Sequence, residues 1–241
     1  MKRIIFLLLL IPSFLFGSSS LFDVIDDQVK SDDVGFPYGA NKRTVMFWMQ
    51  RISTGDVSGE RFFYFYGSDQ AVGYAFSLKI ADASSNIWFQ GAGADYTWDT
   101  LIDIPDKQWH HLAVTFNGTT TRTYKDGLLT RTSVQALTTT DVEYGFTLGA
   151  YRGDLGYWMP AIFYDFVIYN RCLSDDEIKF SMTKNIIPDK NTVSYWLFDT
   201  GYNDKTTYDL SGNNNNNAKH TGTSDGNSNP PILMQLIYAG D

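Results

Sequence analysis

The stretch from Trp109 to Gly127 places the tightest limit on what this chain can fold into. In residues 109–116, WHHLAVTF, positions 110, 112, 114 and 116 form one face and the residues between them the other, a period of two that predicts a strand. Asn117-Gly118 then predicts a turn, residues 122–125 a second strand, and Asp126-Gly127 a turn that accepts positive φ. The stretch is therefore expected to be a β-hairpin closed by a second tight turn.

Composition extends this expectation to the whole chain. Aromatic residues make up 16% of the 241 residues, beside 20 glycines and 7 prolines. This mixture suits many short strands joined by turns, and few windows carry helical periodicity. The sequence therefore predicts an all-β fold with a core large enough to need no crosslink, since the lone Cys172 cannot form an internal disulfide.

The hairpin also resembles a known family. A Trp-His-His opening, the alternating strand, a glycine turn and the ending Tyr124-x-Asp126-Gly127 are similar to the central hairpin of laminin-G-like domains. These domains belong to the concanavalin A-like lectin/glucanase superfamily, which also contains the pentraxins. Residues 148–174, which run from Leu-Gly to Tyr-Asn-Arg-Cys-Leu-Ser, resemble the C-terminal signature of the same family. The resemblance implies a two-sheet antiparallel jelly-roll sandwich with one short helix near residues 175–182.

The start of that helix can be predicted from local chemistry alone. Ser174 and Glu177 have the spacing of a capping box, in which each side chain accepts a hydrogen bond from the backbone of the other. Asp175 and Asp176 lie in the first turn, where negative charge complements the helix dipole. These acidic residues are therefore interpreted as structural.

Residues 1–20 are interpreted as a signal peptide. Lys2 and Arg3 precede an apolar run from Ile4 to Phe16, and small residues follow at 17–20. A membrane anchor is the alternative, but the run is shorter than the ~20 residues that a spanning helix needs. We therefore expect the chain to be exported, either secreted or held at a cell surface or in a periplasm, with no membrane span after the signal is removed.

The charge of the chain argues against two classes of partner. The whole chain has a net charge of −8, and without Lys2 and Arg3 the mature part is near −10. An acidic surface repels nucleic acid and anionic lipid, and it is compatible with cations and neutral glycans. No nucleic-acid partner is expected.

The end of the chain departs from the usual family order. Residues 192–200 and 208–213 resemble the segment that ordinarily begins a laminin-G-like domain, whereas the mature N-terminus lacks it. Either the chain is circularly permuted, so that residues 192–200 supply the first family strand, or a second repeat begins and is cut short. The expected sandwich spans residues 21–217. Residues 218–241 are expected to form a flexible linker and tail, in which Ile232–Tyr238 is either one more strand or a docking segment.

Catalysis is not expected. Glucan-cleaving members of the superfamily carry a Glu-x-Asp-x-Glu cluster on one strand, but this chain has only Glu60, Glu143 and Glu177, far apart in sequence. His110 and His111 do not form a zinc site, because successive strand residues point to opposite faces.

Two aspartates are candidate calcium ligands. In pentraxin-like relatives, a loop after an aromatic strand and a loop after the Leu-Gly strand supply oxygen ligands, and the matching positions here are Asp69 and Asp154. The alternative is that both are ordinary turn residues.

Four aromatic residues lie in or beside the same loops: Tyr66, Tyr151, Tyr157 and Trp158. Aromatic faces beside polar groups commonly grip sugar rings or peptide chains, although such residues can also cap a core. The sequence therefore favours a non-catalytic module that binds a glycan or an extracellular protein at a loop rim, with calcium as a candidate cofactor. A structural or adhesive surface module and a diverged glycoside hydrolase are the alternatives.

Overall fold

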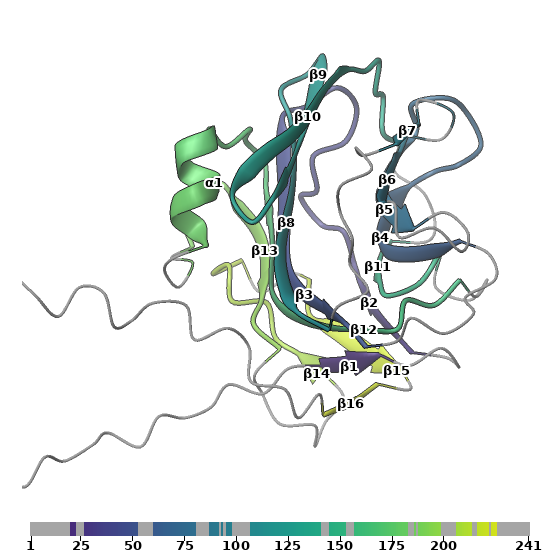
Figure 1. Ribbon diagram of the computed structural model, residues 1–241, viewed down its shortest axis with the longest axis vertical. Coiled ribbons are helices and arrows are strands. Elements are labelled where there is room, and N and C mark those ends of the chain that lie inside the picture. The colour runs from purple at the N-terminus through teal and green to yellow at the C-terminus, as the bar shows by residue number, and fades with distance from the viewer. Residues whose placement is uncertain are drawn as a thin grey trace, which may run out of the picture.

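The fold is a sandwich of two antiparallel β-sheets with one short helix outside it (Figure 1). The computed structural model describes residues 20–22, 27–52, 60–80, 87–91, 93, 95–97, 107–140, 145–152, 157–182, 186, 188–198, 206–213, 216–221 and 223–225. The predicted all-β jelly-roll class is confirmed. Helix α1 (Asp175–Ser181) packs on the outer side of the first sheet.

The first sheet, sheet A, is organised around the long strands β3 and β12. Its order is β10-β9-β8-β3-β12-β1-β16, and β13 also pairs with β12. Its strands are β1 (Ser20–Phe22), β3 (Arg43–Arg51), β8 (Trp109–Phe116), β9 (Thr120–Lys125), β10 (Leu128–Val134), β12 (Ala161–Tyr169), β13 (Thr192–Trp196) and β16 (Ser224–Asp225).

The second sheet, sheet B, faces sheet A across the core. Its order is β14-β15-β2-β11-β4-β5-β6-β7. Its strands are β2 (Gln28–Ser31), β4 (Arg61–Gly67), β5 (Ala75–Ile80), β6 (Ile87–Gln90), β7 (Tyr96–Thr97), β11 (Phe146–Leu148), β14 (Thr206–Thr207) and β15 (Ala218–Thr221).

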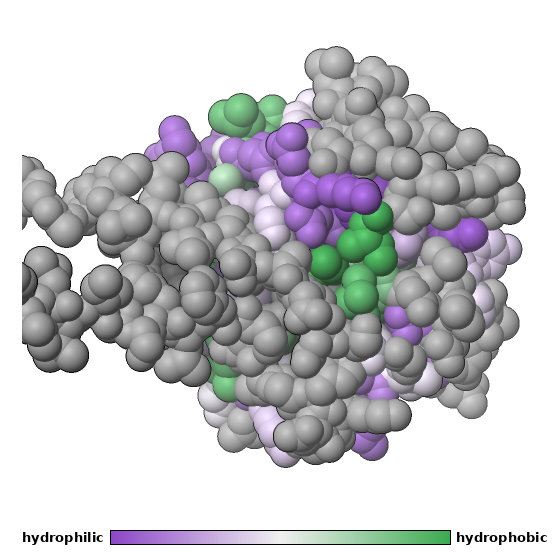
Figure 2. Space-filling view, turned by 60° about the horizontal axis from the view of Figure 1, so that its bottom comes forward, coloured by the Kyte–Doolittle hydropathy of each residue, from purple (hydrophilic) through white to green (hydrophobic). Residues whose placement is uncertain are grey.

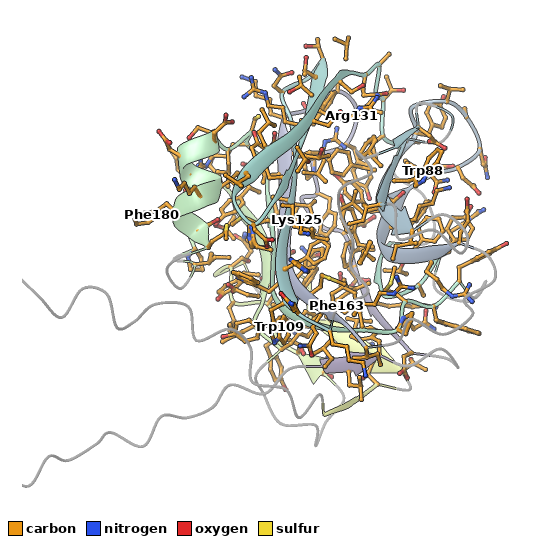
Figure 3. All side chains as sticks on the ribbon, in the orientation of Figure 1. Trp88, Trp109, Lys125, Arg131, Phe163 and Phe180 are labelled. Atoms are coloured by element: carbon orange, nitrogen blue, oxygen red, sulfur yellow. The ribbon has the colours of Figure 1, made fainter. Side chains whose placement is uncertain are left out.

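Aromatic side chains fill the space between the sheets (Figure 3). Phe166 lies 5.1 Å from Phe47 and 5.3 Å from Phe146 between ring centroids, and Trp196 lies 5.2 Å from Phe146. Burial of one such side chain contributes about 1.5–3 kcal/mol, so this cluster is the main source of stability. In contrast, the surface in Figure 2 is mixed, with a hydrophobic patch bordered by hydrophilic residues.

The predicted hairpin forms, and its histidines belong to the framework. β8 pairs with β9, and Asp126 closes the following turn with a φ of 50°. The Asp126 carboxylate lies 2.9 Å from His110 Nδ1 and accepts a hydrogen bond from the His111 backbone N–H at 2.9 Å. His111 packs edge-on against Trp48, and burial lowers the pKa of His111 to about 4, although the nearby Asp126 opposes this shift.

Helix α1 begins with the predicted capping box. The Ser174 hydroxyl accepts from the Glu177 backbone at 3.2 Å, and the Glu177 carboxylate accepts from the Ser174 backbone at 2.8 Å. Ile178 is the buried residue of the helix, whereas Phe180 points away from the molecule (Figure 3). Among the described residues, no helix has the length and apolarity needed to span a membrane.

The C-terminal segment completes both sheets. β13 pairs with β12 from Phe166↔Trp196 to Tyr169↔Thr192, within the same sandwich, which is the position that circular permutation requires. Residues 218–221, which we expected in a flexible linker, instead form β15 and pair with β2. They form a strand because one edge of β2 is open to pair with them. Such a tertiary contact cannot be predicted from local composition. Residues 1–19 and the tail segment 232–238 lie outside the described residues, and Ser20, expected at the end of the signal peptide, pairs with Phe163 in β12.

Candidate functional site

The candidate site is the outer face of β4, on the side of sheet B that points away from the core. The register of β4 shifts between Phe62 and Tyr64, so Phe63 and Tyr64 both turn inward while Phe62 and Phe65 turn outward. Phe62 and Phe65 form a small apolar cluster with Ala75 of the neighbouring strand. We call this surface and the residues packed on it the β4 face.

The chain after β11 doubles back over the β4 face. The Gly149 N–H donates to the Phe63 carbonyl at 2.8 Å, and Gly149 has a φ of 79°. A Cβ at this position would lie 2.3 Å from the Phe22 ring, so only glycine fits. The turn brings the Tyr151 ring to 4.7 Å from Phe62 and 5.0 Å from Phe65 between centroids.

Tyr157 returns to the same surface. The Tyr157 carbonyl accepts from the Phe62 N–H at 3.1 Å, and its ring lies edge-on to Tyr151 at 5.7 Å. Tyr157 is 43% exposed, and it shares a left-handed backbone conformation with Arg152, at φ 59° and 48°. Trp158 is half-buried, and its indole N–H has no hydrogen-bond partner in the part of the chain that the structure describes. Non-glycine residues with a left-handed backbone, such as Tyr157 and Arg152, are strained and concentrate at ligand sites.

A polar cluster borders the aromatic rings. The Tyr151 hydroxyl donates to the Asp69 carboxylate, and Arg152 Nη1 lies 2.8 Å and 3.0 Å from the two oxygens of the same carboxylate. Burial raises the pKa of Tyr151 to about 12, and the hydrogen bond to Asp69 adds to this shift. The Arg152 side chain is only 14% exposed, so the cluster holds Tyr151 in a fixed orientation.

The described residues do not fit a calcium ion at Asp69. Its carboxylate is engaged by the Arg152 guanidinium and by the Tyr151 hydroxyl, which take the positions that a cation would need. Asp154, the second predicted ligand, lies outside the described residues. No group of three His, Cys, Asp or Glu side chains comes together anywhere in the described ranges.

Tyr66 differs from the other three aromatic candidates. It is fully buried between the sheets, and its hydroxyl accepts from Arg43 Nη1 at 3.1 Å. Burial raises the pKa of Tyr66, which the neighbouring Arg43 partly offsets. Because the bulge in β4 turns Tyr66 inward, this residue belongs to the core and not to the β4 face.

Sequence reasoning missed Phe62, Phe65 and the ion pair beside them. Lys79 Nζ lies 2.5 Å from Glu60 and 5.8 Å from the centroid of the Phe62 ring. The run RFFYFYG is aromatic on both faces, so no two-residue pattern shows which rings turn outward. Only the bulge in β4 determines that Phe62 and Phe65 face outward.

Comparison with known proteins agrees with this architecture. A family described as the concanavalin A-like lectin/glucanases superfamily matches residues 23–179. The chain belongs to this superfamily. The matched range contains β3, β4, β8, β11 and β12 and every residue of the β4 face. No curated protein sequence matches the chain.

Solved structures with little sequence similarity share the fold. A candidate carbohydrate-binding protein from Bacteroides ovatus ATCC 8483 superposes with a TM-score of 0.69 at 14% identity, over 90% of this chain and 60% of the other. A heptameric SAP-like pentraxin from Limulus polyphemus has a TM-score of 0.55 at 14% identity, over 77% of this chain and 94% of the other. The binding domain of Paraclostridial Mosquitocidal Protein 1 has a TM-score of 0.50 at 15% identity, over 72% and 54%. This chain thus spans about three fifths of the length of the Bacteroides protein.

Proposed function

We propose that the protein is an exported, non-catalytic module that binds a glycan on the β4 face. The observation that carries this proposal is the half-exposed Tyr157 ring, held beside Tyr151 and next to the polar Asp69–Arg152 cluster. A rigid aromatic ring beside fixed polar groups is the arrangement that binds the apolar face of a sugar and its hydroxyls together. The names of the Bacteroides and mosquitocidal structures are in keeping with a binding role for the fold.

The glutamates support binding over catalysis. Retaining glycosidases need two carboxyl groups about 5–5.5 Å apart. Glu60 is paired with Lys79, and Glu177 serves the cap of α1. Glu143 lies outside the described residues. The described glutamates are thus both committed to structural contacts.

Export is part of the same proposal, because the N-terminal stretch has the charge and length of a signal peptide. Expression in a bacterial host followed by N-terminal sequencing of the exported product tests it. A first residue between 18 and 21 is expected. Retention in the cytoplasm with an intact N-terminus would contradict export, with no bearing on glycan binding.

A glycan array followed by calorimetric titration of the best ligand tests the binding proposal. The Tyr157→Ala variant is expected to bind about tenfold more weakly, equivalent to the loss of about 1.4 kcal/mol of ring contact. Trp158→Ala is expected to weaken binding in the same direction. Because Arg152 and Tyr151 already engage Asp69, addition of a chelator is expected to leave affinity unchanged.

A matched control is Tyr208→Ala. Tyr208 is 52% exposed and follows β14, at the edge of sheet B four strand positions from β4. Equal loss in both tyrosine variants, or no glycan bound by the wild-type chain, would contradict a glycan site on the β4 face.

A protein ligand is the second candidate, favoured by strand β10. β10 is the edge strand of sheet A, and Leu128, Leu129 and Val134 on it are 67%, 44% and 82% exposed. Exposed apolar side chains on a free sheet edge are typical of an adhesive contact. Failure of all glycans together with capture of a defined extracellular protein, lost in Leu128→Lys, would favour this structural or adhesive function.

A further inference from the structure

A separate hollow lies where β3 begins and β12 ends. It has a volume of about 580 Å³ and is lined by Gly35, Phe36, Pro37, Asn41, Lys42 and Asn170. This volume falls within the ~300–1,000 Å³ of small-ligand sites. None of the lining residues belongs to the β4 face.

One wall of the hollow is held from inside the core by Arg43. Its Nη2 donates to the Gly39 carbonyl at 2.5 Å, and its Nε donates to the Asn41 carbonyl at 3.0 Å. The guanidinium is fully buried and lies 5.1 Å and 5.2 Å from the ring centroids of Phe76 and Phe116. The backbone of residues 39–42 is therefore held by the Arg43 side chain, which cannot move without disrupting the packing of the core.

Two further lining residues, Phe36 and Asn170, are also anchored. Phe36 is buried and packs edge-on against Tyr66, at 5.5 Å between ring centroids. Asn170 is held by its backbone N–H, which donates to the Asn191 carbonyl at 2.9 Å. The hollow is thus a rigid feature built from three segments of the chain.

The polar side chains of the hollow are available to a ligand. Asn41, Lys42 and Asn170 are exposed, and across the described residues no hydrogen bond or ion pair engages their side chains. Lys42 is the charged lining residue, so the hollow presents one positive charge in a chain of net charge −8. An anionic group is the complement of this charge.

We propose that this hollow is a second binding site, specific for an acidic saccharide such as a uronic acid. The Lys42 ammonium pairs with the sugar carboxylate. The amides of Asn41 and Asn170, each with one acceptor and two donors, match neighbouring hydroxyl groups. We assign a sugar and not an acidic peptide, because sugar hydroxyl groups both donate and accept hydrogen bonds, as the amides of Asn41 and Asn170 do. The site stands independently of the β4 face.

Titration of the full chain with D-glucuronate and, in parallel, with D-glucose tests this inference. Backbone and side-chain amide signals in a ¹H–¹⁵N NMR spectrum report which residues are contacted. Glucuronate is expected to shift the signals of Asn41 and Asn170, whereas glucose at equal concentration shifts them at least about fivefold less, because it lacks the charge. Raising ionic strength is expected to weaken the glucuronate response.

Variants separate charge from shape. Lys42→Gln is expected to remove the preference for glucuronate, a loss of about fivefold, and Asn170→Ala to weaken glucuronate by a similar factor. Lys107→Gln is the control, because Lys107 is exposed and precedes β8, whereas the hollow lies near the end of β3 that pairs with the last residue of β8. All three positions are exposed, so the fold is expected to persist, and the NMR spectrum itself shows this.

Three results would overturn the inference: equal response to glucose, an unchanged response in Lys42→Gln, or tighter binding of a poly-glutamate peptide at the same residues. The last would assign the hollow to acidic peptides. Tyr157→Ala is expected to leave the glucuronate response intact, so loss of glycan binding on the β4 face and failure at the hollow are distinguishable.

Discussion

At the scale of single residues, Arg43 shows how one buried cation can organise distant parts of a fold. Its hydrogen-bond partners are two backbone carbonyls and the Tyr66 hydroxyl, and three aromatic rings surround it. Neutral acceptors and ring faces replace the water that a guanidinium loses on burial. Arg43 thus ties the turn at 39–41 to the core.

Replacing Arg43 should therefore be costly. Arg43→Met is expected to lower the free energy of unfolding by about 3 kcal/mol, because it removes the donor to the buried Tyr66 hydroxyl and to two partly buried carbonyls. Tyr66→Phe, which removes only one acceptor, is expected to cost about 1 kcal/mol. Urea unfolding followed by tryptophan fluorescence measures both. An equal cost for the two variants would show that the guanidinium contributes no more than its bond to Tyr66.

His111 makes stability depend on pH. Burial lowers its pKa to about 4, below the value of about 6.5 in the unfolded chain. The unfolded state therefore binds a proton between pH 6.5 and 4 that the folded state does not. Stability from this group is complete above pH 6.5 and falls as pH drops toward 4, by up to about 3 kcal/mol.

Unfolding measured at pH 7 and pH 4.5 checks this expectation. His111→Leu is expected to flatten the curve across that window, because leucine takes up no proton. Burial raises the pKa of Asp126, but hydrogen bonds from His110 and His111 lower it overall. Protonation of Asp126 therefore affects stability only below the pH window of His111. A wild-type curve that is level from pH 7 to 4.5 would contradict the assignment to His111.

Residue roles could be predicted where they depend on local chemistry. The capping box of α1 and the turn at Asp126-Gly127 follow from neighbours in sequence. Tyr66 and Tyr151 could not be sorted this way, because a bulge in β4 and the doubling back after Gly149 decide which ring faces the core. Asp69 is predicted as a candidate calcium ligand or, alternatively, a turn residue, and neither prediction includes its partner Arg152, which lies far along the chain.

At the scale of elements, strand β13 contributes the largest fully buried side chain among the described residues. Trp196 is fully buried, and its indole N–H donates to the Asn216 carbonyl at 2.8 Å. Its ring also packs on Phe146 of the opposite sheet, at 5.2 Å between centroids. β13 therefore joins the two sheets as well as extending one of them.

Trp196→Ala is expected to lower the free energy of unfolding by about 3–5 kcal/mol, because it opens a large cavity. Trp196→Phe keeps most of the ring and is expected to cost about half as much. Thermal unfolding by circular dichroism measures both changes. A shift in Trp196→Ala no larger than in an exposed variant such as Phe180→Ala would show that β13 is dispensable.

The elements also show why the sequence predicts some strands and not others. Residues 192–196 carry an apolar pattern and a family resemblance, so their strand is visible in advance. β15 reads AKHT, and nothing in that composition favours a strand. It forms because β2 supplies an antiparallel partner at Lys30↔Lys219 and Val29↔His220.

At the scale of the whole molecule, the two described ends of the chain lie side by side. Ser20 of β1 pairs with Asp225 of β16. The family order would place the segment of β13 before β2, and here it follows α1 instead. Ends that meet in one sheet make such rearrangement compatible with a single sandwich.

A permuted chain tests this directly. Residues 188–225 placed before residues 20–187, with a short Gly/Ser linker from 225 to 20, are expected to fold with a free energy of unfolding within about 2 kcal/mol of the original. Deletion of residues 191–241 is expected to abolish folding, because it removes β13 and β15. Near-ultraviolet circular dichroism distinguishes folded from unfolded chains. A folded deletion variant would favour the truncated-repeat interpretation.

The pairing of β1 with β16 and of β2 with β15 also fixes when the protein can fold. Sheet B is incomplete until synthesis has reached residue 221, and sheet A until it has reached residue 225, because β2 and β1 pair with the last strands of their sheets. Contacts between residues so far apart in sequence form slowly. A nascent chain of this order therefore stays open while it is being made, and this open state is the one that the export proposed above would use.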